Sequence, residues 1–141
     1  MAEVMAGFVC GYALAVIVTP VAALTLVRAR LTSQTVRTAL PEGTSLVAVS
    51  VLLHTAAFLV CTALGILLGL LLGGLESRSP SGGLGSPNQV FTAFILAATA
   101  VAVVPMGVYA VRLRVPLLAG GLLFAGIFGW LMPYLALWGP G

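Results

Sequence analysis

Four long apolar stretches constrain this chain more than any other feature of its sequence. They run over about residues 4–27, 46–72, 90–111 and 116–138. A helix that crosses a bilayer needs roughly 20 mainly apolar residues, because each residue adds ~1.5 Å to a path of ~30 Å through hydrocarbon. None of the stretches alternates apolar and polar residues as a membrane β-barrel strand does. The sequence therefore predicts an all-α integral membrane protein, with a single four-helix transmembrane domain over residues 1–141.

The composition argues against a soluble protein. Of the 141 residues, 61% are hydrophobic and 6% are charged, whereas a soluble domain carries about 25% charged residues. The net charge of +3 comes from arginine alone, since the chain has no lysine. These arginines flank the apolar stretches and form no basic stripe interleaved with aromatic residues, so we expect no nucleic-acid partner.

The arginines also predict the orientation. Five of them follow the first and third stretches, and the segment between the second and third stretches holds only Arg78. By the positive-inside rule, loops 28–45 and 112–115 are cytoplasmic, while the Gly/Ser/Pro linker 73–89 and both termini lie outside an inner membrane of the cytoplasmic type. The start of the chain carries Glu3 and no basic residue, unlike a signal peptide, so we expect the first helix to be retained. The residues expected to contact lipid headgroups or a partner are Arg28, Arg30, Arg37, Arg112 and Arg114.

Small residues recur every four positions in three of the stretches. Residues four apart share one helix face, and small ones let two backbones approach closely, which drives association in lipid. We therefore predict a helix-packing face. Whether its partner helix belongs to this chain, to a second copy or to another protein is left open by the pattern. The glycines of this face are Gly65, Gly69 and Gly73, Gly7 and Gly11, and Gly121 and Gly129.

His54 is the one histidine and lies eight residues into the second stretch. At ~1.5 Å per residue it sits about 12 Å from the start of that helix. An ionisable residue at such depth is a functional-site hypothesis, because it needs a partner there. It could be an axial haem ligand, a proton relay or a hydrogen-bond donor to a quinone. The alternative is a neutral imidazole bonded to a neighbouring helix. We expect no cofactor, with haem at His54 as the exception to test.

Catalysis by this chain is not expected. Its acidic residues, Glu3, Glu42 and Glu76, map to the ends of stretches or to loops, whereas a proton-coupled carrier usually has a carboxylate within the membrane. Cys10 and Cys61 are predicted at different depths, as small packing residues, and two thiols do not form a metal site. No triad, paired carboxylates or phosphate-binding glycine loop is present.

The first functional interpretation is a small polytopic membrane protein that acts as a structural or assembly subunit of a larger membrane complex or of a homo-oligomer. Its partners are then membrane lipids and other membrane subunits. The alternative is a small oligomeric channel or carrier, with His54, Thr19, Thr55, Thr62 and Thr99 as its polar groups within the membrane. A third interpretation is a haem- or quinone-binding subunit that uses His54.

A weak internal echo raises the question of duplication. Residues 19–30 read TPVAALTLVRAR, and residues 104–114 read VPMGVYAVRLR. The two segments permit a pair of parallel-repeat helical hairpins. However, Pro20 precedes Arg28 by eight residues, and Pro105 precedes Arg112 by seven. One residue turns a helix by ~100°, so prolines and arginines cannot both superpose. The arginine pairs are also expected from topology alone.

Overall fold

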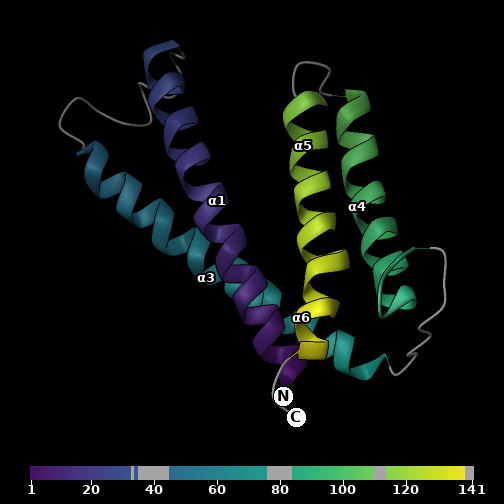
Figure 1. Ribbon diagram of the computed structural model, residues 1–141. Coiled ribbons are helices and arrows are strands. Elements are labelled where there is room, and N and C mark those ends of the chain that lie inside the picture. Colours follow the sequence, from purple (N-terminus) through teal and green to yellow (C-terminus); the bar gives the residue numbers. More distant parts are fainter. Residues whose placement is uncertain (33, 35–44, 76–83, 110–113, 139–141) are drawn as a thin grey trace.

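The computed structural model describes residues 1–32, 34, 45–75, 84–109 and 114–138, and all regular structure in these ranges is helical (Figure 1). The prediction of an all-α protein with four helices suited in length and composition to span a membrane is confirmed. Four helical segments of the described chain are long and apolar enough to cross a membrane. They are Ala2–Arg28, Val47–Gly74, Gln89–Tyr109 and Arg114–Trp138.

The helices are α1 (Ala2–Thr32), α3 (Leu46–Gly74), α4 (Gln89–Tyr109) and a last span in three parts. That span consists of α5 (Arg114–Phe124), the π-helical η2 (Ala125–Leu131) and α6 (Met132–Trp138). Polar residues set several ends. Ser45 Oγ accepts the N–H of Ala48 at the start of α3, as an N-cap does.

Two boundaries differ from the sequence-based ranges. α1 continues through the arginine segment to Thr32 instead of ending at residue 27, and the Thr32 hydroxyl donates to the Arg28 carbonyl at 2.9 Å. Gly73 and Gly74 belong to α3 rather than to the linker. Charged and small residues are tolerated at helix ends, so an apolar stretch marks the membrane-spanning part of a helix rather than its full length.

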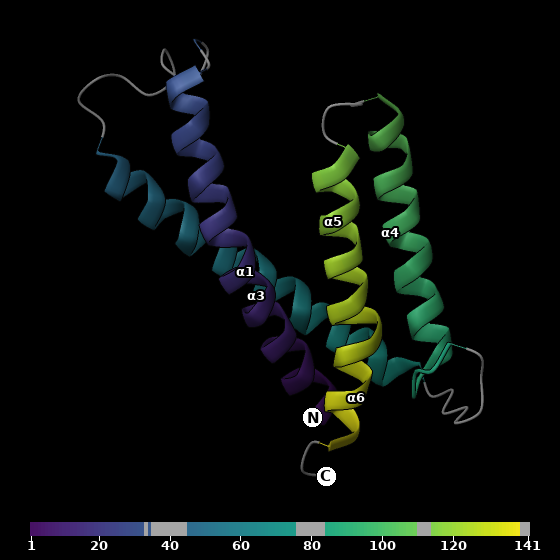
Figure 2. The ribbon, with the colours of Figure 1, turned by 45° about the horizontal axis from the view of Figure 1, so that its top comes forward.

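The four spans form two hairpins that meet at one end only. α1 packs along α3, and α4 packs against α5 and η2, while α1 touches the other hairpin through α6 and η2. Figures 1 and 2 show the hairpins side by side at the end that holds the start of α1 and α6, and apart at the other end. We call these the joined end and the open end.

The core lies at the joined end. Its fully buried large side chains are Phe91, Ile95, Phe128, Met132 and Cys10, drawn from three of the spans. Most other large apolar side chains are exposed. Lipid tails solvate such side chains as well as a protein interior does, so a small core is compatible with a membrane protein.

The π-helical segment η2 ends two residues before Pro133. Proline has no backbone N–H and cannot donate to the carbonyl four residues earlier. Here the N–H of Met132 donates to the carbonyl of Ile127, five residues back. A single wide turn of this kind commonly occurs where a helix interior must absorb an irregular residue.

Candidate functional site

The crossing of α1 and α3 brings glycine backbones into direct contact. A methyl group at Gly65 would overlap the carbonyl oxygen of Gly7 and lie 3.1 Å from Cα of Gly11. A methyl group at Gly69 would lie 2.5 Å from the carbonyl oxygen of Glu3 and 3.0 Å from Cα of Val4. The contacts with the two carbonyl oxygens are too short for any real Cβ, so no residue larger than glycine fits there without moving a helix.

The other glycines of the predicted face have different surroundings. A methyl group at Gly73 would meet only the Glu3 side chain, at 3.8 Å. At Gly121 it would lie 2.8 Å from Cγ2 of Val103 on α4, and at Gly129 it would lie 3.7 Å from Cγ2 of Ile95. The seven glycines therefore do not form one continuous surface. That their spacing drives helix association stays a prediction.

A polar junction closes the joined end, formed by Ser86, Asn88 and Thr92 and the carbonyl groups they contact. The Asn88 side chain bridges two helices. Its Nδ2 donates to the carbonyl of Leu75 at the end of α3 at 2.8 Å, and its Oδ1 accepts the N–H of Phe91 in α4 at 3.0 Å. Asn88 thus caps α4 and ties it to α3.

Thr92 links the junction to the last span. Its Oγ1 lies 2.6 Å from the carbonyl oxygen of Gly129 in η2 and 2.6 Å from Oγ of Ser86. In regular α-helical pairing the Gly129 carbonyl would accept from residue 133, which is a proline without an N–H. The Thr92 hydroxyl is close enough to the Gly129 carbonyl to donate to it in place of that N–H. Threonine hydroxyls of neighbouring helices commonly satisfy carbonyls that a proline releases in a membrane helix.

The segment before α4 is also held by the last span. The indole N–H of Trp130 donates to the carbonyl of Leu84, and the Tyr134 hydroxyl donates to that of Gly85, each at 2.8 Å. Gly85 has a φ of +60°, which glycine adopts without strain. A Gly/Ser/Pro composition is typical of a spacer, yet residues 84–88 make specific contacts. Residues 76–83 of the linker lie outside the described residues.

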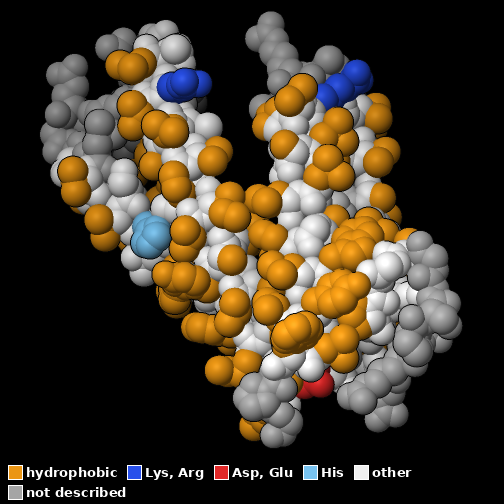
Figure 3. Space-filling view, in the orientation of Figure 1, with side chains coloured by type: hydrophobic (Ala, Val, Ile, Leu, Met, Phe, Trp, Pro, Cys, Tyr) orange, Lys and Arg blue, Asp and Glu red, His pale blue; other side chains and the backbone are white. Residues whose placement is uncertain are grey.

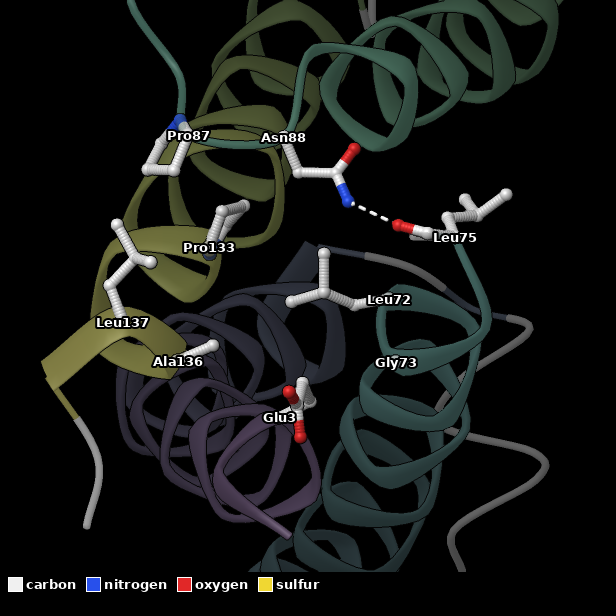
Figure 4. Close-up of a pocket in the computed structure, with 9 residues that line it drawn as sticks. All are labelled: Glu3, Leu72, Gly73, Leu75, Pro87, Asn88, Pro133, Ala136 and Leu137. Carbon is white, nitrogen blue, oxygen red and sulfur yellow. Dashed lines mark hydrogen bonds between the residues drawn. The ribbon is translucent and has the colours of Figure 1, made fainter. Parts of the chain in front are cut away.

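A cavity of about 300 Å³ lies beside this junction. Figure 4 shows Glu3 on one wall, with Asn88 donating to Leu75 on the other. The N-terminal ammonium group is 3.2 Å from Oε2 of Glu3. The cavity thus offers one carboxylate and an amide that is already bonded. No three His, Cys, Asp or Glu side chains come together as a metal site in the part of the chain that the structure describes.

His54 lies on an exposed face of α3, visible as the pale blue side chain in Figure 3. With Val47, Ser50 and Val51 it lines an open groove of about 380 Å³. It makes no hydrogen bond to any other described residue. Thus the structure does not provide the neighbouring-helix carbonyl considered for it, at least within the described ranges.

The threonines proposed as polar groups of a channel all bond their own helices. Each hydroxyl donates to a carbonyl four residues earlier, at 2.6 to 3.0 Å. Thr19 and Thr62 are buried, whereas Thr55 is exposed. A hydroxyl satisfied in this way can face apolar surroundings without a further partner. The four residues are Thr19, Thr55, Thr62 and Thr99.

Two of the five candidate headgroup-binding arginines have described side chains, and both lie at the open end. Arg28 is exposed on α1, and Arg114 begins α5 and donates through Nε to the carbonyl of Gly107 at 2.7 Å. Arg30 falls within α1, but its side chain is not among those described. Arg37 and Arg112 lie outside the described residues. Both cysteines, Cys10 and Cys61, are free thiols.

The polar junction is the part of the site that sequence reasoning missed. The segment Ser86-Pro87-Asn88 directly before an apolar run is a helix-start signal and could have indicated a cap. The bonds from Asn88 to Leu75 and from Thr92 to Gly129 join residues 13 and 37 positions apart. No local pattern indicates such partners.

Comparison with known proteins supplies no relative. No protein-family model, curated protein or solved structure matches the chain. Any assignment of function therefore rests on the geometry described above.

Proposed function

We propose that this chain is a small polytopic membrane subunit that packs against another membrane protein or against copies of itself. The observation that carries the proposal is the exposed His54 on α3, with no hydrogen-bond partner among the described residues. The groove around His54 and Ser50 would be the contact surface.

The reason is energetic. His54 follows the first residue of α3 by eight positions, so it lies about 12 Å into a helix whose span must cross a ~30 Å hydrocarbon core. Lipid tails have no group that can accept or donate a hydrogen bond to imidazole. A polar side chain left in that setting costs free energy, and such residues usually face another helix or a water-filled cavity. A partner chain meets this requirement at the groove.

Replacing His54 by leucine tests the contact. We expect the wild-type protein, purified in mild detergent, to run in native mass spectrometry as a complex with a partner or with copies of itself. His54→Leu should lose most of that species, because interhelical hydrogen bonds in membranes contribute about 1–2 kcal/mol, or roughly a tenfold change in association. Thr55→Val is the matched control, since the Thr55 hydroxyl bonds its own helix.

Two results would count against the subunit proposal. One is a monomeric wild-type protein, and the other is a complex that His54→Leu leaves intact. A Soret band in the purified protein that is lost in His54→Leu would instead support the haem interpretation. The four threonines do not support the channel interpretation, because their hydroxyls donate to carbonyls of their own helices.

The orientation is part of the same proposal. Five arginines flank the open end in the sequence, so we propose that this end faces the cytoplasm and that both termini lie outside. A duplicated hairpin stays a prediction. The first hairpin crosses through glycine backbones and the second packs Gly121 against Val103, so the two halves are packed differently.

Cysteine labelling tests the orientation. We expect a membrane-impermeant maleimide added to intact cells to label Ser81→Cys, in the linker, and to spare Leu31→Cys at the end of α1, whose side chain is exposed. After the membrane is opened, both should react. Labelling of Leu31→Cys alone in intact cells would reverse the proposed orientation.

A further inference from the structure

The two hairpins enclose a cleft at the open end. Figure 3 shows the molecular surface hollowed between α1 and α5, with apolar side chains on both walls and a basic side chain near the upper end of α1. α5 contributes no buried residue to the protein interior. We call this space the interhairpin cleft.

The α1 wall follows from helix geometry. Ala6, Cys10 and Leu14 belong to the core cluster at the joined end, together with residues of η2 and α6. Positions three or four residues apart share a helix face. The same face therefore continues through residues Ile17, Val21, Leu24 and Arg28, which are all exposed.

The α5 wall follows in the same way. Gly121 points at α4, where an added methyl group would lie 2.8 Å from Cγ2 of Val103. Leu123 is two residues on, or ~200° around the helix, yet it still packs against the core cluster. Gly120 and Pro116 precede Leu123 by three and seven residues and share its face. A methyl group at Gly120 would meet nothing within 4 Å.

The depth of the cleft corresponds to one leaflet. Its floor is the core cluster, where Leu14, Ile127 and Phe128 are buried. From Leu14 to Arg28 is 14 residues, or roughly 21 Å of helix. Half of a ~30 Å hydrocarbon core is ~15 Å, and the remaining length reaches the headgroup level. A transmembrane helix would be blocked by the floor halfway across the membrane, whereas the acyl chains of a lipid are only one leaflet long and end at that depth.

The α1 rim of the cleft carries an exposed arginine, Arg28. Its carbonyl accepts from the Thr32 hydroxyl, and its side chain makes no hydrogen bond or ion pair with another described residue. Arg114, at the start of α5, lies on the side of that helix that faces α4, where its Nε donates to the Gly107 carbonyl. The described acidic residue, Glu3, lies at the joined end.

We propose that the interhairpin cleft binds an anionic glycerophospholipid of the leaflet at the open end. Arg28 binds its headgroup, and Ile17, Val21, Leu24 and Gly120 contact its acyl chains. Guanidinium groups bind phosphate oxygens in a fixed fork geometry, and apolar walls one leaflet deep fit lipid tails. This site is independent of the His54 contact, which lies on α3.

Lipid selectivity tests the site. The protein is reconstituted in vesicles of phosphatidylglycerol and phosphatidylcholine with identical acyl chains, extracted gently, and its retained lipid is measured by native mass spectrometry. We expect the wild-type protein to retain phosphatidylglycerol preferentially. Arg28→Gln should lower that preference about fivefold, since one arginine near a charged headgroup contributes roughly that factor. Molar salt should lower it too, because it shortens the Debye length from ~10 to ~3 Å.

A substitution that fills the cleft distinguishes lipid bound there from lipid bound elsewhere on the protein surface. Val21→Trp should release both lipids, because the indole occupies the acyl-chain space. Leu67→Trp, at an equally exposed position on α3, should leave retention unchanged. Equal retention of the two lipids by the wild type, or unchanged retention in Val21→Trp, would overturn the proposal. A protein rather than a lipid photo-cross-linked at position 21 would do the same.

Discussion

Gly65→Ala is expected to unfold the α1–α3 crossing, whereas Gly73→Ala, two turns later on the same helix, is expected to be tolerated. The two glycines belong to the same four-residue series, and the substitution adds the same methyl group. At Gly65 this group would overlap the carbonyl oxygen of Gly7, and at Gly73 it would meet only the Glu3 side chain, at 3.8 Å. Comparing the two variants therefore distinguishes the effect of backbone contact from the effect of the four-residue spacing.

The expected difference is large because backbone atoms cannot rotate away. Overpacking a close contact usually costs about 1–3 kcal/mol when side chains give way, and more when they cannot. At Gly65 the crossing must widen along both helices, so we expect a loss of at least ~3 kcal/mol. At Gly73 we expect no loss, since alanine is the better helix former by about 1 kcal/mol.

Unfolding by sodium dodecyl sulfate in mixed micelles, followed by circular dichroism and tryptophan fluorescence, measures both variants. Gly65→Ala should unfold at a clearly lower detergent fraction than the wild type. Equal transitions for Gly65→Ala and Gly73→Ala would show that the glycine crossing contributes little to stability. The spacing would then have no role in helix association within this chain.

Thr92→Val is expected to destabilise the joined end by about 1–3 kcal/mol, the usual cost of a buried polar group that loses its partner. Valine has nearly the shape of threonine but lacks the hydroxyl that lies 2.6 Å from the Gly129 carbonyl. That carbonyl has no donor at residue 133, a proline. Thr92→Ser, which keeps the hydroxyl, is the matched control.

A second substitution makes the explanation specific. Pro133→Ala restores an N–H that can donate to the Gly129 carbonyl, so the hydroxyl of Thr92 becomes less important. The cost of Thr92→Val should therefore be smaller in a Pro133→Ala background, and a double-mutant cycle gives the coupling as the difference. We expect a coupling of about 1 kcal/mol. Strictly additive effects would show that Thr92 does not act through the carbonyl left by Pro133.

The spans could be predicted because their cause is local. A run of apolar residues long enough to cross hydrocarbon is sufficient to predict a membrane helix. The described helices cover the first, second and fourth predicted stretches, and the third up to Tyr109. Spacing of four placed Gly7, Gly11, Gly65 and Gly69 on helix faces. It could not say which helix each face meets, because that depends on how the hairpins assemble.

The polar junction could not be predicted, because its causes are not local. The contact of the Thr92 hydroxyl with Gly129 depends on Pro133, which lies in another span, 41 positions later in the sequence. Residues 84–88 look like a spacer by composition and are held by Trp130 and Tyr134.

The two hairpins contact each other only near the joined end among the described residues, so the rest of each hairpin extends away from that contact. The described part of α1 beyond Leu14 reaches Thr32, which is 18 residues or ~27 Å of helix. A rotation of about 10° at the joined end therefore moves the tips by ~5 Å relative to each other. Any rotation of one hairpin against the other would therefore change the distance between Arg28 on α1 and Arg114 on α5 more than it changes distances at the joined end.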